Sequence, residues 1–175
     1  MTSERARRRF HEVFAPYLDD AYSLAKWLAG QGSDAEDIVQ EAAIRALAAL
    51  ERAEVVKPKA WTLAIIRNTA LTYLARKNPG ALAFVGDIDD LEALEFAFDA
   101  APNAEQILIA EQTGARVRDA IAALPSPLKE TLIMREINEL DYKEIAEATS
   151  APIGTVMSRL ARARAAIARA LKDLR

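Results

Sequence analysis

Hydrophobic residues recur every three or four positions along most of this 175-residue chain, the spacing that gathers them on one face of an α-helix. The first such series is Phe14, Leu18, Tyr22, Ala25 and Leu28, and Gly30-Gln31-Gly32 would end the helix that carries it. β-Branched residues are scattered and do not alternate with polar ones, so the pattern gives strands little support. It therefore predicts an all-α protein.

Polar residues mark the start of the next helices. Ser33-Asp34-Ala35-Glu36 has the form of a capping box, so Ser33 is expected to cap a helix. The apolar side of that helix would carry Val39, Ala42, Ala46 and Leu50, and its polar side Asp37, Gln40 and Glu41. A further helix is predicted from about Lys59 to Lys77, with Trp61, Ile65 and Thr69 in a buried stripe.

Two breaks divide the chain into domains. Asn78-Pro79-Gly80 ends the first helical block, and an acidic stretch follows that still contains phenylalanines and leucines. Asn103 can cap the next helix, which Leu124-Pro125-Ser126-Pro127 stops near Ala123. The expected organisation is two small helical domains, 10–77 and 103–175, joined by an acidic linker at 78–102.

Charge follows the same division. The net charge of the whole chain is −3, but it is +2 over residues 1–77, −8 over 78–111 and +3 over 112–175. The acidity therefore lies in the central segment, and a total near zero hides two mildly basic ends. Such segregation leaves nucleic-acid binding open for the ends.

The last third of the chain predicts a helix-turn-helix. Asp141-Tyr142-Lys143-Glu144 is a second capping-box pattern, and a turn at 149–152 separates its short helix from a long last helix. The last helix has an apolar stripe (Val156, Leu160, Ala163, Ile167 and Leu171) and outward residues (Thr155, Ser158, Arg159, Arg162 and Arg169). Small residues at its start and arginines beyond suit the major groove of DNA. The alternative is a solvated, arginine-rich helix surface.

Several motifs resemble the extracytoplasmic-function (ECF) sigma factors of bacterial RNA polymerase. Leu124-Pro125, Arg135-Glu136, Tyr142 to Ala146 and Pro152 to Arg164 are similar, in order, to the fourth region of that family. "DAEDIVQEAAIRAL" and "KPKAWTLAIIRNTALTYLARK" resemble the polymerase-binding and −10-reading helices of its second region. The resemblance covers about residues 10–77 and 103–175.

The resemblance implies a role for each matching position. Ser158, Arg159 and Arg162 would lie in the −35 major groove, with Thr155 and Arg164 near its phosphates. The −10 element would be met by Arg67, Asn68, Thr72 and Arg76, and the polymerase clamp by Asp37, Gln40 and Glu41. The implied partners are core RNA polymerase, promoter DNA and an anti-sigma factor.

Three positions depart from the family pattern. Thr72 stands where many members have aspartate, and the loop from Arg52 to Lys57, assigned to capture of a flipped −10 base, is short and contains Glu54. Ser150 occupies a turn position where glycine is common. A positive φ there would cost about 1 kcal/mol.

The sequence gives less support to other classes of function. The chain has no cysteine, one histidine (His11) and no phosphate-binding loop, so we expect neither an enzyme nor a cofactor or metal site. No apolar run has the length of a membrane span, and the N-terminus lacks a signal-peptide core, which predicts a cytoplasmic protein. A sigma-like decoy that sequesters an anti-sigma factor without binding DNA is the alternative. A simple helix-turn-helix repressor would leave residues 10–77 without a role.

Overall fold

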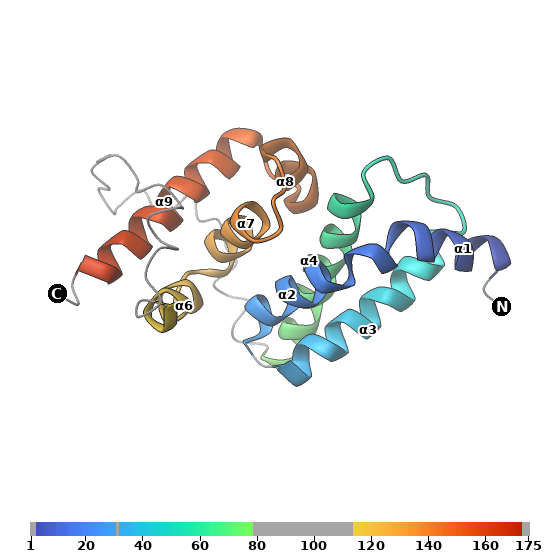
Figure 1. Cartoon of the computed structure of the whole chain (residues 1–175), viewed down its shortest axis with the longest axis horizontal. Coiled ribbons are helices and arrows are strands. Elements are labelled where there is room, and N and C mark those ends of the chain that lie inside the picture. The colour runs from blue at the N-terminus through green and yellow to red at the C-terminus, as the bar shows by residue number, and fades with distance from the viewer. Residues whose placement is uncertain (1–2, 31, 79–113, 173–175) are drawn as a thin grey trace.

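The computed structural model describes residues 3–30, 32–78 and 114–172, and the regular structure in these ranges is helical. The elements are α1 (Glu4–Val13), the 3-10 turn η1 (Ala15–Tyr17), α2 (Leu18–Ala29), α3 (Gly32–Ala49), α4 (Pro58–Lys77), α6 (Gly114–Ala122), α7 (Ser126–Glu136), α8 (Tyr142–Thr149) and α9 (Ile153–Lys172) (Figure 1). The all-α prediction is confirmed. The acidic linker, apart from Asn78, and the expected cap Asn103 lie outside the described residues.

Helices α2, α3 and α4 pack together as the N-terminal domain (described residues 3–78), and α1 lies against α3 (Figure 1). Leu24, Ile38, Leu63 and Ile66 are fully buried between them. Burying each such side chain contributes about 1.5–3 kcal/mol. On α3 the buried stripe is Ala35, Ile38, Ala42 and Ala46, whereas the expected core residue Val39 flanks it and is half-buried.

Two local predictions for this domain were wrong. The series from Phe14 to Leu28 is not one helix, because Pro16 lies in η1 and separates α1 from α2. Proline has no amide hydrogen and disfavours the helical conformation of the residue before it. Ser33 is not a cap either, since α3 begins at Gly32 and places Ser33 inside its first turn.

The buried positions of α4 also differ from the expected stripe. Thr69 is buried as predicted, but Trp61 and Ile65 are only half-buried and pack against the edge of the core. Leu63 and Ile66 are the fully buried large residues of this helix. The reason is that α4 touches α2, α3 and α8, so contact on several sides replaces a single apolar stripe.

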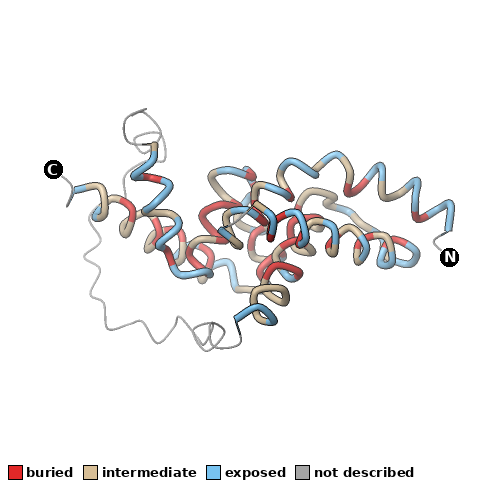
Figure 2. Tube along the Cα trace, turned by 90° about the horizontal axis from the view of Figure 1, so that it is seen from below, coloured by how far each residue is buried: buried red, intermediate tan, exposed pale blue. Residues whose placement is uncertain are grey.

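Helices α6 to α9 form the C-terminal domain (described residues 114–172), in which α9 packs on α6, α7 and α8. Its core includes Leu132, Ile133, Ile145, Leu160 and Ile167. The two domains also touch each other, through α2 with α7 and through α4 with α8. Figure 2 shows buried positions on both sides of this contact, and one hydrophobic cluster runs across it.

Candidate nucleic-acid interface

The start of α8 is fixed by the predicted capping box around Asp141, which is confirmed. The Asp141 carboxylate accepts a hydrogen bond from the Glu144 amide (2.8 Å), and the Asp141 amide donates to the Glu144 carboxylate (2.9 Å). The hydrogen bond from the Glu144 backbone lowers the pKa of the Asp141 carboxyl. Both orphan amides are thus satisfied, and α8 is held in place for the turn that follows.

Ser150 ends α8 in the left-handed conformation, with φ of 52°. We expect Ser150→Gly to raise the free energy of unfolding by about 0.5–1 kcal/mol, because glycine adopts this φ without strain. Ser158→Gly is the control, since the same exchange inside α9 should destabilise by about 0.5–1 kcal/mol. Urea unfolding followed by circular dichroism measures both. A loss of stability with Ser150→Gly would contradict the strained turn.

Helix α9 has one buried side and one outward side. Val156, Leu160, Ala163 and Ile167 are buried as predicted, and they fix the helix on the domain. On the other side Ser158 is exposed, and Thr155, Arg159 and Arg162 are half-exposed. Ser158 Oγ donates to the Thr155 carbonyl at 3.0 Å. These four of the predicted outward residues therefore lie on one side of the first three turns of the helix, and Arg169 is exposed near its end.

Arg164 is placed differently from the other arginines. Its Nε and Nη2 lie 3.2 and 2.5 Å from Glu136 Oε1, and 24% of its side chain is exposed. Arg135 directly precedes Glu136, and its guanidinium lies 5.3 Å from the centre of the Tyr142 ring. These motif residues tie α7 to α8 and α9, so they also hold the helix-turn-helix together.

The sequence patterns did not single out Ile153 and Met157. They are 44% and 53% exposed on the first turns of α9, one turn apart and beside Ser158. Because both residues lie outside the stripe that contains Val156 and Leu160, the sequence could have indicated that they are exposed. Apolar side chains at this place can contact thymine methyl groups.

In the N-terminal domain, Asn68, Thr72 and Arg76 form a line along α4, as the spacing predicted. Asn68 is exposed, the Thr72 hydroxyl donates to the Asn68 carbonyl at 2.9 Å, and the Arg76 side chain is 64% exposed. Arg67 lies beside this line, and its Nη1 donates a hydrogen bond to Asn68 Oδ1 at 3.2 Å. Its side chain is 16% exposed and forms an ion pair with Glu130 of the C-terminal domain.

The acidic surface of α3 adjoins this line. Asp37 and Gln40 are exposed, and Glu41 is half-exposed. The Glu41 carboxylate forms ion pairs with Arg45 and, at 3.5 Å, with Arg76. The expected polymerase-binding and −10 residues are therefore in direct contact at one edge of the domain.

Asp34, expected as part of a capping box, instead joins α3 to α4. Lys77 Nζ lies 2.6 and 2.8 Å from its carboxylate oxygens, and the Tyr73 hydroxyl lies 3.1 Å from Oδ1. The hydrogen bond from Lys77 lowers the pKa of Asp34. Burial, with the neighbouring Asp34 and Asp37, raises the pKa of Tyr73 to about 12.

The raised pKa of Tyr73 predicts a difference in tyrosine titration. Its neutral phenol is favoured in the folded state, so this stabilisation is present below the unfolded pKa of about 10 and is lost as the pH rises through about 12. Up to about pH 11, tyrosinate absorbance should rise equally in wild type and Tyr73→Phe. In concentrated urea, where the fold and its contacts are lost, the rise of the wild type should exceed that of Tyr73→Phe by one tyrosine's share. A smaller rise in Tyr73→Phe would show that the contact is absent.

The loop expected to capture a −10 base borders a cavity. Its volume is about 390 Å³, and its walls come from the loop, α4 and α8: Glu54, Val55, Val56, Lys57, Trp61, Glu147 and Ala148 among them. One wall of this cavity therefore belongs to the C-terminal domain.

The described ranges contain neither a candidate metal site nor a candidate membrane-spanning helix. No group of three or more histidine, aspartate or glutamate side chains there could hold a metal ion. None of the helices seen in those ranges is both long and apolar enough to cross a membrane.

Comparison with known proteins agrees with this arrangement of helices and surfaces. Residues 13–79 match the family described as Sigma-70 region 2, and residues 114–167 match Sigma-70, region 4. The two domains and the helix-turn-helix thus define a sigma-70-type sigma factor. The ECF RNA polymerase sigma-E factor of Escherichia coli (strain K12) is 33% identical over 169 residues, 92% of this chain and 85% of that protein. The chain belongs to the ECF family of RNA polymerase sigma factors.

A further relative supports the assignment, and a solved structure has the same fold. The RNA polymerase sigma-H factor of Pseudomonas aeruginosa is 30% identical over 172 residues, 96% of this chain and 89% of that protein. The sigma factor RpoE from Bartonella quintana, crystallised in complex with the anti-sigma factor NepR, aligns with a TM-score of 0.70. That alignment covers 94% of this chain and 98% of the other at 22% identity, and it shows a shared fold.

Proposed function

We propose that this ECF sigma factor binds core RNA polymerase in the cytoplasm, directs it to promoters with −35 and −10 elements, and performs no catalysis itself. The observation that carries this proposal is α9, which is fixed by a buried stripe and presents Ser158, Arg159 and Arg162 outward. A helix held in this way can enter a major groove without rearranging its domain.

At the −35 element, Arg162 would pair with guanine through two hydrogen bonds, and Arg159 would bind phosphate. Thr155 and Arg164 would lie near the backbone. The ion pair of Arg164 with Glu136 uses Nε and Nη2, so a phosphate contact through Nη1 is compatible with it. Arg164 would then both brace the helix-turn-helix and touch DNA.

At the −10 element, Asn68, Thr72 and Arg76 would face DNA, and Arg67 would join them once its pair with Glu130 opens. Asp37, Gln40 and Glu41 would meet the polymerase clamp. The contact of Glu41 with Arg76 at 3.5 Å joins these two surfaces, so polymerase binding and DNA binding share an edge of the domain. An anti-sigma factor is the expected regulator, because the similar RpoE structure contains one.

Transcription with core RNA polymerase tests this function. Templates should carry an intact promoter, an altered −35 element or an altered −10 element, and transcript should require both the protein and the intact elements. The decoy alternative is not favoured by the comparisons, since the relatives are sigma factors. It predicts binding to an anti-sigma factor with no transcript from any template, and that result would reject the proposed function.

A further inference from the structure

Two large apolar side chains lie exposed on the outward side of α9. Ile153 and Met157 are 44% and 53% exposed and lie on consecutive turns of the helix. Ala161, which is half-buried, continues this line by one more turn, and we call these three residues the apolar row. Single apolar residues are common on protein surfaces, whereas neighbouring ones on the side that carries the DNA-binding arginines indicate an apolar partner.

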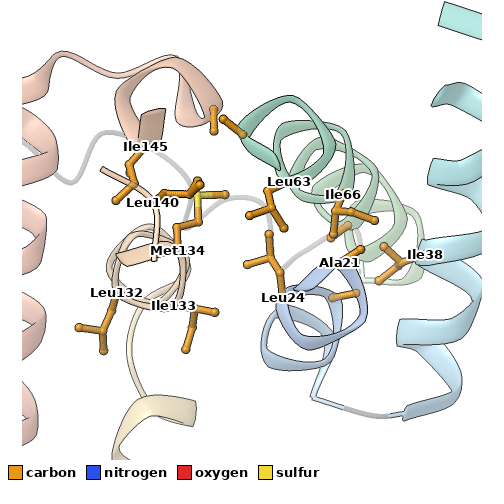
Figure 3. Packing of buried hydrophobic residues seen from close by; sticks show 14 of the residues in the cluster. Ala21, Leu24, Ile38, Leu63, Ile66, Leu132, Ile133, Met134, Leu140 and Ile145 are labelled. Atoms are coloured by element: carbon orange, nitrogen blue, oxygen red, sulfur yellow. The ribbon is translucent and has the colours of Figure 1, made fainter. Parts of the chain in front are cut away.

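The core of the C-terminal domain is built without the apolar row. Val156 and Leu160 of α9 are at most 1% exposed and belong to the same buried cluster as Leu132 and Ile145, which Figure 3 shows in this core. These inward residues are sufficient to hold α9 on α7 and α8. The exposed side chain of Met157 is therefore available for a contact outside the domain.

The surroundings of the apolar row favour DNA as that partner. Gly154, Ser158 and Arg162 follow one another at a spacing of four residues and form a polar row beside it. No neighbouring part of the described chain lies within 4 Å of the place where a Cβ of Gly154 would be, so the backbone of the first turn is uncovered. Helix α9 also carries arginines and a lysine but no acidic residue. A narrow, positively charged helix start suits a polyanion with a groove.

The major groove presents an apolar group at thymine, whose 5-methyl group points into it. Residues near the start of a recognition helix are those that contact base edges there. One helical turn rises about 5.4 Å, and neighbouring bases of one strand lie about 3.4 Å apart. Side chains one turn apart, such as Ile153 and Met157, can therefore reach base pairs that are one or two steps apart.

We propose that Met157 and Ile153 determine part of the −35 specificity of this sigma factor by contact with thymine methyl groups. Met157 selects one thymine, and Ile153 selects a second one or two base pairs away. Arg162 in the polar row selects guanine in the same groove. This inference rests on the proposed function, which places α9 in the −35 major groove, and it adds the kind of base that the apolar row recognises there.

Removal of single methyl groups from the DNA tests this contact. The preferred −35 element is first selected from a library with a randomised −35 region by transcription with core RNA polymerase and the full chain. Each thymine in it is then replaced by deoxyuridine, which lacks only the methyl group. At one position the wild-type holoenzyme should bind the deoxyuridine template about fourfold more weakly, a change that corresponds to about 0.8 kcal/mol for one buried methyl group.

The variants assign each methyl group to a side chain. Met157→Ala should bind the thymine and deoxyuridine templates equally at that position, and Ile153→Ala should do so at the second thymine. Met157→Gln, which keeps the length of the side chain but ends in a polar group, should behave like Met157→Ala, whereas Met157→Leu should keep the difference between the two templates. Because Met157 is 53% exposed, these variants retain the fold.

Ile137→Ala is the matched control, because Ile137 is 40% exposed but lies at the end of α7, outside the recognition helix. It should keep the full fourfold difference. A selected element without thymine, or equal sensitivity of the wild type and Met157→Ala at every thymine, would overturn the inference. So would a Met157→Ala variant that binds an anti-sigma factor more weakly and DNA unchanged, since the apolar row would then face a protein.

The same experiment separates this inference from the proposed function. If transcription requires the protein and depends on Arg162, but no methyl group matters, only the role of the apolar row is rejected. If no template gives a transcript, the proposed function is rejected, and the role of the apolar row is rejected with it.

Discussion

Leu160→Ala should lower the free energy of unfolding of the C-terminal domain by about 2–5 kcal/mol. Leu160 is 1% exposed in the middle of the α9 stripe, and α9 packs on α6, α7 and α8. Truncation removes buried methyl groups and leaves a cavity that helices on three sides cannot easily fill. Since typical domains are stable by only about 5–15 kcal/mol, this is a large share of the total. Urea unfolding monitored by helix circular dichroism measures the loss.

Met157→Ala is the control on the same helix. Met157 is 53% exposed, so its truncation should change the free energy of unfolding by less than about 0.5 kcal/mol. The comparison separates the inward side of α9 from its outward side. Similar losses for Leu160→Ala and Met157→Ala would mean that the outward side is covered in solution and is not available to DNA.

Arg162→Ala should reduce transcription from an intact −35 promoter by about 10- to 100-fold. A two-bond contact of arginine with guanine contributes about 1–3 kcal/mol of discrimination, and each 1.4 kcal/mol corresponds to about a tenfold change. On a template with an altered −35 element, the variant and wild type should differ little, because the specific contact is then absent from both. Binding to core polymerase should stay unchanged, since Arg162 lies on α9, far along the chain from α3.

Arg169→Ala controls for the loss of one positive charge. Arg169 lies on the same helix, nearly two turns beyond Arg162, and the change should lower transcription on both templates only slightly. If Arg169→Ala and Arg162→Ala had equal effects, α9 would attract DNA by charge alone. The outward surface would then position the protein without reading the −35 sequence.

The helix-turn-helix was predictable from the sequence because its determinants are local. The capping box spans Asp141 to Glu144. The buried residues from Val156 to Ile167 recur about once in each helical turn. Both patterns follow from local helix geometry, which involves only residues that are near each other in the sequence. They can therefore be recognised without knowledge of the tertiary structure. Predictions failed at Ser33, because α3 already begins at Gly32, and along α4, where contact with several other helices replaced a single stripe.

The sequence by itself determined that the chain is helical, where most helices lie, and which side of α9 carries arginines. Only the tertiary structure decided what those helices meet. Arg67 and Glu130 are 63 residues apart, and Asn138 and Asp20 are 118 apart, so no periodicity connects them. Such contacts form only where the tertiary structure brings two surfaces together. A buried carboxylate such as that of Glu130 then needs a positively charged partner from the facing surface. For this reason the sequence predicted Arg67 only as a DNA contact, whereas in the structure Arg67 forms an ion pair that connects the two domains.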